Sequence, residues 1–293
     1  MTLAEYLTAQ QRRIDHTLDR LVPAESTPPE TIHKAMRYSL FAGGKRIRPL
    51  LCLAASEAVA DFTPGIEEVA SSLELIHTYS LIHDDLPALD NDDLRRGRPT
   101  CHKVFGEAMA ILAGDSLLTL AFEVLANAPG DDGRRARLVG ELARASGTVG
   151  GMIAGQVLDI ESEGAEPSAP LLASIHHAKT GALLRASLRF GAVQSSASEE
   201  QLEALSSFGA HIGLAFQIVD DLLDVEESTA ALGKTAGKDA AQGKVTFPAV
   251  YGIERSHAMA EEERLEAHLA LRPFDERAER LRELADFIVR RKA

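Results

Sequence analysis

Residues 83–103 read HDDLPALDNDDLRRGRPTCHK, and this stretch places a group of aspartates directly before a group of arginines. The aspartates are Asp84, Asp85, Asp90, Asp92 and Asp93, and the arginines are Arg95, Arg96 and Arg98. Carboxylates this close together repel one another unless a cation lies among them. Mg²⁺ prefers such oxygen ligands and shares its coordination with substrate phosphates, while guanidinium groups bind phosphate oxygens in pairs. The stretch predicts a metal–phosphate site; taken alone, it also fits a solvated charged turn.

A second aspartate-rich stretch, GLAFQIVDDLLD at residues 213–224, favours the metal site over the charged turn. Asp220 and Asp224 are four residues apart, so on a helix they lie on one face, with their Cβ atoms about 5–6 Å apart. Apolar residues surround them, and burying carboxylates without a counter-ion is costly. The two stretches together predict two helices that face each other across a cavity, with metal ions and a polyphosphate between them.

The two stretches, together with GGKRIRP at residues 43–49, resemble the trans-isoprenyl diphosphate synthases. The first has the form Asp-Asp-x-x-x-x-Asp and the second has the form Asp-Asp-x-x-Asp. The motifs run in the family's order from about Lys45 to Pro248, and the resemblance is nearest to the bacterial farnesyl diphosphate synthases. It implies an all-α, single-domain bundle of ten or more helices around a central cavity, the isoprenoid synthase fold, with residues 1–293 forming one polyprenyl synthetase domain.

The composition agrees with a helical enzyme that does not bind nucleic acid. Aromatic residues make up 5% of the chain and tryptophan is absent, while alanine and leucine, which favour helices, are abundant. The net charge of −13 makes a nucleic acid an unfavourable partner. Two cysteines, Cys52 and Cys101, fit a reducing cytoplasm. We expect no signal peptide in residues 1–25 and no stretch of roughly 20 apolar residues that would span a bilayer.

The resemblance assigns residues to three binding functions. Metal ions, expected to be several Mg²⁺, would be bound by Asp84, Asp85, Asp90, Asp220 and Asp224. Isopentenyl diphosphate would be bound by Lys45, Arg48, His77 and Arg96. The allylic diphosphate and the forming carbocation would be contacted by Arg95, Lys179, Thr180, Gln217, Lys234 and Lys244. The cations after Gly43-Gly44 would equally suit a helix C-terminus, and a single histidine in a helix is more often structural than a ligand.

Three further features have open interpretations. Gly155-Gln156-x-x-Asp159 resembles another family motif in which Asp159 lines the diphosphate site and Gln156 supports it, although a surface Gln and Asp would look the same. Residues 232–244 are rich in glycine and lysine without the phosphate-loop spacing, which favours a lid that closes on diphosphate. The terminal Arg290, Arg291 and Lys292 either close over the site or complement the end of a helix.

The implied reaction is ionisation of an allylic diphosphate, attack of the cation on isopentenyl diphosphate, and loss of a proton. Metal ions and cationic side chains would stabilise the departing diphosphate, and a closed lid would exclude water. Pro87 disrupts the helix inside the first motif, so that Asp84 and Asp90 can reach the same ions despite the two-residue insertion.

The length of the product is expected to depend on the residues below Asp84. Tyr79 and Ser80 precede Asp84 by five and four residues, about one helical turn deeper. By resemblance, an aromatic residue at this position together with the two-residue insertion is typical of synthases that make the C15 product, (E,E)-farnesyl diphosphate.

Four other functions are compatible with parts of the sequence. A synthase that makes a C10 or C20 product would share the site. A terpene cyclase is disfavoured, because its second metal motif typically mixes Asn or Asp with Ser/Thr and Glu. A catalytically silent regulatory subunit would not need intact aspartate motifs with Lys179, Lys234 and Gln217, and a plain cation-binding bundle would not need the basic clusters. The family is usually homodimeric, but no residue pattern locates an interface.

Overall fold

The computed structural model describes residues 1–164, 166–226 and 244–290, and these residues are almost entirely helical. The only strands within them are the short antiparallel β1 (Leu94–Arg95) and β2 (Arg98–Pro99). The expectation of an all-α fold is therefore confirmed. The chain divides into two compact units, Met1–Leu53 with Pro64–Val139, and Ala54–Thr63 with Gly140–Ala293. That the whole chain acts as one domain stays a prediction.

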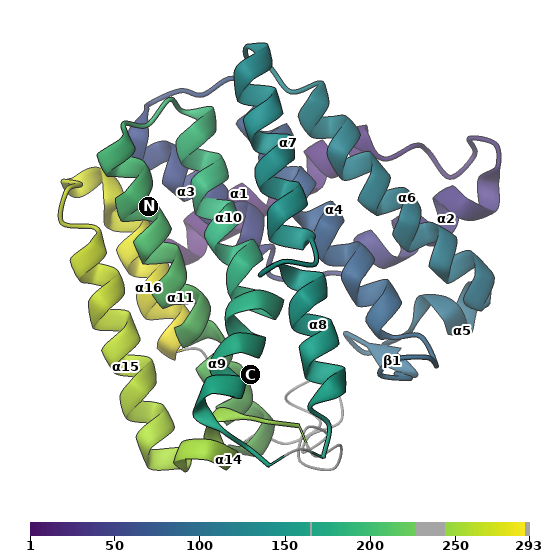
Figure 1. The fold of residues 1–293 in the computed structure, drawn as a ribbon. Helices are drawn as coiled ribbons and strands as arrows, with labels where there is room; N and C mark the ends of the chain where they lie inside the picture. Colours follow the sequence, from purple (N-terminus) through teal and green to yellow (C-terminus); the bar gives the residue numbers. More distant parts are fainter. Residues whose placement is uncertain (165, 227–243, 291–293) are drawn as a thin grey trace. The chain divides into compact units, whose positions relative to one another are not determined.

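The first unit is built around two helices that lie side by side, α4 and α6 (Figure 1). Its helices are α1 (Leu3–Leu21), α2 (Glu30–Leu40), the first half of α3 (Ile47–Val59), α4 (Ile66–Asp84), α5 (Cys101–Phe105), α6 (Glu107–Ala126) and the start of α7 (Asp132–Ser146). Gly114 of α6 has no side chain where His83 of α4 packs, and a Cβ atom there would overlap the imidazole. This close approach helps to hold the aspartate-bearing end of α4 in place.

The second unit surrounds the long helix α11 (Glu199–Glu226), which contacts α10, α15 and α16 (Figure 1). Its other helices are α8 (Met152–Glu161), α9 (Ala169–His176), the π-helix η1 (His177–Gly181), α10 (Ala182–Gln194), α14 (Phe247–Tyr251), α15 (Ile253–Ala270), the 3-10 helix η2 (Glu276–Ala278) and α16 (Glu279–Arg290). The second aspartate motif lies in the last turns of α11, so the packing of this helix positions the motif.

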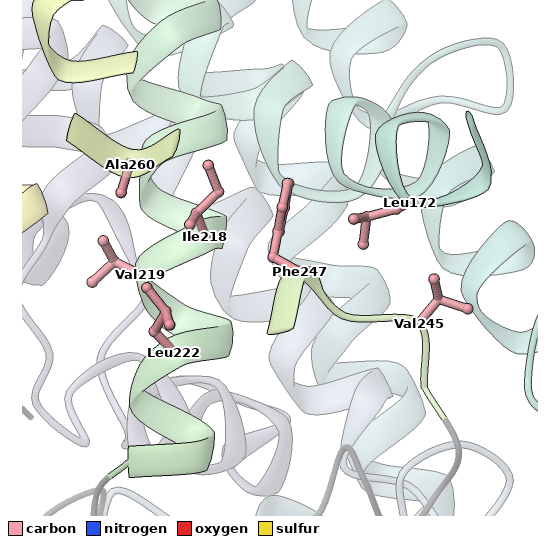
Figure 2. Packing of buried hydrophobic residues seen from close by; sticks show 7 residues of the cluster. All are labelled: Leu172, Ile218, Val219, Leu222, Val245, Phe247 and Ala260. Atoms are coloured by element: carbon pink, nitrogen blue, oxygen red, sulfur yellow. The ribbon is translucent and has the colours of Figure 1, made fainter. Parts of the chain in front are cut away.

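A hydrophobic cluster holds the start of α14 against α11 and α9 (Figure 2). Its residues are Leu172, Ile218, Val219, Leu222, Val245, Phe247 and Ala260. All are buried, and each large apolar side chain among them contributes roughly 1.5–3 kcal/mol by leaving water. Phe247 points between α9 and α11 in Figure 2, so the chain just after residue 243 is anchored beside the aspartate motif.

Two of the described helices, α6 and α11, are long and apolar enough to cross a membrane by length and composition alone. The expectation that no segment would reach this threshold is therefore not confirmed by that criterion. Core helices of water-soluble proteins satisfy the same criterion, and α11 is largely buried within the protein. The two helices are weak indicators of a membrane span.

Candidate active site

The first aspartate motif is a turn that folds the chain back on the end of α4. The helix ends at Asp84, three residues before Pro87. The backbone NH of Asp90 then donates to the carbonyl of Asp84 at 2.8 Å, and the NH of Asp92 donates to that of Asp85 at 3.2 Å. The break at Pro87 thus places Asp90 beside Asp84, as the sequence predicted. Both residues are half-buried, and their binding of a metal ion stays a prediction.

Asp85 has a different environment from its neighbour Asp84. It is buried, with 3% of its surface exposed. One of its oxygens accepts a hydrogen bond from Nε of Arg95 at 2.7 Å and lies 2.5 Å from Nη2 of the same guanidinium in an ion pair. Burial raises the pKa of the Asp85 carboxyl, and the Arg95 guanidinium opposes this rise. The pair uses one oxygen of Asp85 and two nitrogens of Arg95. The assignments of Asp85 to the metal and of Arg95 to the diphosphate stay predictions.

The residues assigned to isopentenyl diphosphate gather in the first unit. Arg96 lies over the Gly43-Gly44 loop and donates to the carbonyl of Gly43. Gly44 has a φ of +130°, a conformation that residues with a side chain rarely adopt, so the loop favours glycine there. Burial lowers the pKa of His77 well below its ordinary value, and the positive charges of Arg48 and Arg96 lower it further. A neutral His77 among arginines fits a site in which the cations face a phosphate group; Lys45 is exposed on the same loop.

Arg46 is a buried arginine to which the sequence analysis assigned no role. Only 4% of its surface is exposed. Its guanidinium donates to Asp15 at 2.9 Å, to Glu74 at 2.7 Å and to the carbonyl of Leu40 at 2.7 Å. Arg46 therefore fixes the segment that carries Lys45 in the loop and Arg48 at the start of α3. Glu74 could have indicated this buried ion pair from the sequence, because it is a carboxylate within a mostly apolar helical stretch.

Tyr79 lies on α4, five residues before Asp84, with 6% of its surface exposed. Its ring packs edge-on against the ring of His83 at a centroid distance of 5.7 Å. Its hydroxyl is buried and has no hydrogen-bond partner among the described residues, and burial raises its pKa to about 12. Ser80 is tied to its own helix, because its hydroxyl donates to the carbonyl of His77 at 2.9 Å.

In the second unit, α8 and the π-helix η1 bring Lys179 and Asp159 together. Nζ of Lys179 donates to Oδ2 of Asp159 at 2.6 Å. The two elements touch at Gly155, where any Cβ atom would overlap the backbone N and Cα of Lys179. Gly155 therefore permits the contact between the two segments, which explains the glycine of the Gly155-Gln156-x-x-Asp159 motif. Gln156 is half-buried, and its supporting role stays a prediction.

A chain of hydrogen bonds connects η1 to α11. The hydroxyl of Thr180 donates to Oε1 of Gln217 at 2.9 Å, and Nε2 of Gln217 donates to Oδ1 of Asp221 at 2.8 Å. Oδ2 of Asp221 accepts from the backbone NH of Phe247 at 2.9 Å. Single π-turns are often found at functional positions, and here the π-helix holds both Lys179 and Thr180. The structure thus brings together Thr180 and Gln217, which the sequence analysis paired only by resemblance.

The carboxylates of the two motifs would bind Mg²⁺ only together with ligands from the substrate. Across residues 1–164, 166–226 and 244–290, no three carboxylates, imidazoles or thiols converge as a preformed metal site. The donors are two pairs: Asp84 with Asp90, and Asp220 with Asp224 one turn apart on α11. Such pairs suit Mg²⁺, because this ion keeps waters and takes further ligands from phosphates. The two motifs belong to different compact units, and the expected cavity between them stays a prediction.

Several predicted residues lie outside the described parts of the chain. These are Lys234, most of the expected lid at 232–244, and the terminal Arg291 and Lys292. Lys244 is described and half-buried. Arg290 is largely exposed and lies 4.0 Å from Asp286 of the same helix, which agrees with favourable charge at a helix C-terminus. The assignments of Lys234 and Lys244 to the allylic diphosphate stay predictions.

His176 makes the stability of the second unit sensitive to acid. Burial lowers the pKa of His176 from 6.5 to about 4, and the imidazole stacks on Phe247 at a centroid distance of 5.2 Å. Between pH 6.5 and pH 4, the unfolded chain therefore binds a proton that the folded protein does not. Stability is fully present above pH 6.5 and is lost as the pH falls toward 4.

We expect the wild type to lose about 2 kcal/mol more stability between pH 7 and pH 5 than the His176→Gln variant, which lacks the titrating group. Urea unfolding at the two pH values measures this difference. Equal losses in the two proteins would show that the buried imidazole does not contribute to the acid sensitivity.

Comparison with known proteins identifies the family of the chain. Residues 29–287 match the polyprenyl synthetase family. The chain is 49% identical to the heterodimeric geranylgeranyl pyrophosphate synthase large subunit 1 of Arabidopsis thaliana, over 98% of this chain and 78% of that protein. It is 48% identical to a geranylgeranyl pyrophosphate synthase of Catharanthus roseus, over 98% of this chain and 80% of that protein.

Solved structures of prenyl synthases have the same fold as this chain. An FPP/GFPP synthase from Zymomonas mobilis superposes with a TM-score of 0.88 and 36% identity, over 98% of this chain and 99% of that one. A geranyltransferase from Helicobacter pylori, complexed with magnesium and isoprenyl diphosphate, superposes with a TM-score of 0.87 and 34% identity, over 98% of both chains. The fold is the isoprenoid synthase fold, and the protein is a prenyltransferase. More particularly, the chain belongs to the polyprenyl synthetase family.

Proposed function

We propose that this prenyltransferase condenses isopentenyl diphosphate with dimethylallyl or geranyl diphosphate and stops at the C15 product, (E,E)-farnesyl diphosphate. The observation that carries the proposal is the buried ring of Tyr79 on α4. At 1.5 Å per residue, Tyr79 is about 7.5 Å deeper along the helix than Asp84. A prenyl chain whose diphosphate is held at Asp84 would reach this ring as it grows, and the aromatic floor would stop further extension.

Each group of residues has a part in the proposed reaction. The carboxylate pairs Asp84/Asp90 and Asp220/Asp224 would hold Mg²⁺, which supplies electrostatic stabilisation of the leaving diphosphate. Lys179 would bind the same diphosphate after leaving Asp159, which holds it at 2.6 Å. Arg48, neutral His77 and Arg96 would bind isopentenyl diphosphate. The Thr180–Gln217 pair would place an amide oxygen beside the developing positive charge.

A C20 product is the second candidate. Relatives that are 48–49% identical are named geranylgeranyl pyrophosphate synthases, which favours a longer product. The Zymomonas mobilis neighbour, an FPP/GFPP synthase, supports C15 equally well as a product of this fold. The Tyr79 ring favours C15 in our proposal. Intact aspartate pairs with Lys179 and Gln217 argue against a silent regulatory subunit.

The cofactor, assembly and location are part of the proposal. We expect Mg²⁺ to be required, by analogy with the magnesium and isoprenyl diphosphate in the Helicobacter pylori complex. We expect a homodimer, since α6 exposes Ile111 and Leu112, two apolar side chains that an interface would cover. A cytoplasmic location is expected from the cysteine content. Light scattering on the purified protein would test the assembly, and a monomer would contradict it.

The experiment that tests the function is product analysis. Purified protein is incubated with Mg²⁺, labelled isopentenyl diphosphate, and dimethylallyl or geranyl diphosphate, and chain lengths are resolved by chromatography. A dominant C15 product from both primers is expected. A dominant C20 product would keep the chemistry and overturn the assigned length. No product, with diphosphate binding intact, would favour a silent subunit.

Tyr79→Ala tests the floor directly. Removing the buried ring opens space below Asp84, so we expect C20 or longer products to replace C15 as the main product. Tyr79→Phe is the matched control, because it keeps the ring and removes only a hydroxyl that has no partner in the described part of the chain; its product should stay C15. An unchanged product distribution in Tyr79→Ala would exclude Tyr79 as the floor.

A further inference from the structure

Asp221 is the one aspartate of the second motif to which the sequence analysis assigned no role. It is buried, with 3% of its surface exposed. Its two oxygens serve two different donors: Oδ1 accepts from Nε2 of Gln217 at 2.8 Å, and Oδ2 accepts from the backbone NH of Phe247 at 2.9 Å. Its neighbour Asp220 is half-buried instead. The two adjacent carboxylates therefore occupy different environments, although their side chains are identical.

The bond to Asp221 determines which way the amide of Gln217 points. An ionised carboxylate only accepts hydrogen bonds, so the NH₂ group of Gln217 must face Asp221. The carbonyl oxygen of Gln217 must then face the opposite side, where the hydroxyl of Thr180 donates to it at 2.9 Å. The orientation of this amide thus follows from the two accepting oxygens of Asp221, and the negative end of the amide dipole is presented to Thr180 on the π-helix η1.

A second contact ties Asp221 to the start of α14. Phe247, whose NH binds Asp221, is 3% exposed and belongs to the hydrophobic cluster between α9 and α11 (Figure 2). Its ring stacks on His176 at an interplanar angle of 19°, and Nε2 of His176 lies 3.6 Å from Oδ2 of Asp221. Residues from α9, α11 and α14 therefore meet at one carboxylate.

We propose that Asp221 is a positioning residue rather than a metal ligand. It orients the carbonyl oxygen of Gln217 toward Thr180 and anchors the backbone at the start of α14. The inference rests on the proposed function, which places Thr180 and Gln217 beside the developing carbocation. Reversing the Gln217 amide would present two N–H groups to that cation in place of an oxygen, and the rate of the chemical step would fall.

The Asp221→Asn variant tests the orientation with little change in shape. The oxygen of the introduced amide would keep the bond to the NH of Phe247, and its NH₂ group would face Gln217. All bonds can then be satisfied only if the Gln217 amide flips and turns its NH₂ group toward Thr180. We expect kcat to fall about 10- to 100-fold, with the KM values for both substrates and the Mg²⁺ concentration for half-maximal rate changed by less than about threefold.

The double variant Asp221→Asn with Gln217→Glu provides a rescue. A carboxylate at position 217 accepts from the NH₂ group of the new amide at position 221 and again presents an oxygen to Thr180, and the pair keeps one negative charge in total. We expect the double variant to recover most of the lost kcat. Gln217→Glu alone sets two carboxylates against each other in place of the 2.8 Å hydrogen bond, and should be less active and less stable than the double variant.

Two measurements separate the possible outcomes. Asp220→Asn serves as the comparator for metal binding, and its Mg²⁺ requirement should rise. A similar rise in the Mg²⁺ requirement of Asp221→Asn would overturn the positioning role and assign Asp221 to the metal. No rescue of kcat in the double variant would also overturn the positioning role. Thermal unfolding of the four proteins of the cycle reports the coupling between positions 217 and 221 without any turnover. A wild type that is inactive while this coupling is present would contradict the proposed function, whereas absence of the coupling would contradict the role of Asp221.

Discussion

Replacing Arg46 with methionine is expected to lower the free energy of unfolding by about 3–5 kcal/mol. The guanidinium of Arg46 is buried and bonded to Glu74 at 2.7 Å, and the Glu74 side chain is only 2% exposed. Without Arg46, a buried carboxylate would lose its counter-ion and a strong donor. Methionine fills a similar volume, so the loss measures the missing charge rather than a cavity. Urea unfolding monitored by circular dichroism gives the value.

The control for this experiment is an exposed ion pair in the same unit. Arg20 and Glu68 lie 2.7 Å apart, with 60% of the Arg20 side chain exposed. Arg20→Met should cost less than about 1 kcal/mol, because water screens the pair. The double change Arg46→Met with Glu74→Leu should be milder than Arg46→Met alone, since no charge is left buried. A loss at Arg46 no larger than that at Arg20 would contradict a buried, uncompensated carboxylate as the cause.

Gly155→Ala is expected to impair both stability and catalysis. The added Cβ atom would overlap the backbone of Lys179, which cannot rotate away as a side chain would. Either α8 or η1 must move, and such overpacking typically costs about 1–3 kcal/mol. Because a displacement of about 1 Å in a catalytic group can cost about 100-fold in rate, we expect kcat/KM to fall by that order. Thermal unfolding and steady-state kinetics measure the two effects.

Gly140→Ala is the matched control within α7. A Cβ atom there would meet only the side chain of Arg144, at 3.7 Å. Alanine favours the helix over glycine by about 0.5–1 kcal/mol, so this variant should be slightly more stable and fully active. If Gly155→Ala behaved like Gly140→Ala, the contact between α8 and η1 would not require glycine.

The local geometry that the sequence predicted depends on residues close together in the chain. Pro87 breaks α4, and the backbone bond from Asp90 to Asp84 follows from this local geometry. Thr180 could be matched to Gln217 only through the resemblance, because the two lie 37 residues apart. The apolar spacing of α11 could also be recognised from the sequence. By its length and composition, however, α11 also satisfies the criterion for a membrane span.

The parts that the sequence did not predict are the partners of buried charges. Asp220 and Asp221 are adjacent aspartates in different environments. Asp220 is half-buried, whereas Asp221 accepts hydrogen bonds from the side chain of Gln217 and the backbone NH of Phe247. Arg46 lies between Lys45 and Arg48, and its burial and its contacts with Asp15, Glu74 and the carbonyl of Leu40 distinguish it.

The sequence by itself therefore determined the family and the all-α fold and predicted the carboxylate pairs, since each depends on local spacing and on residue types that the chemistry requires. Only the tertiary structure decided which charged side chains are buried and paired within the protein. The physical reason is that the cost of burying a charge depends on the donors and acceptors around it, and those donors and acceptors come from segments that are distant in the chain.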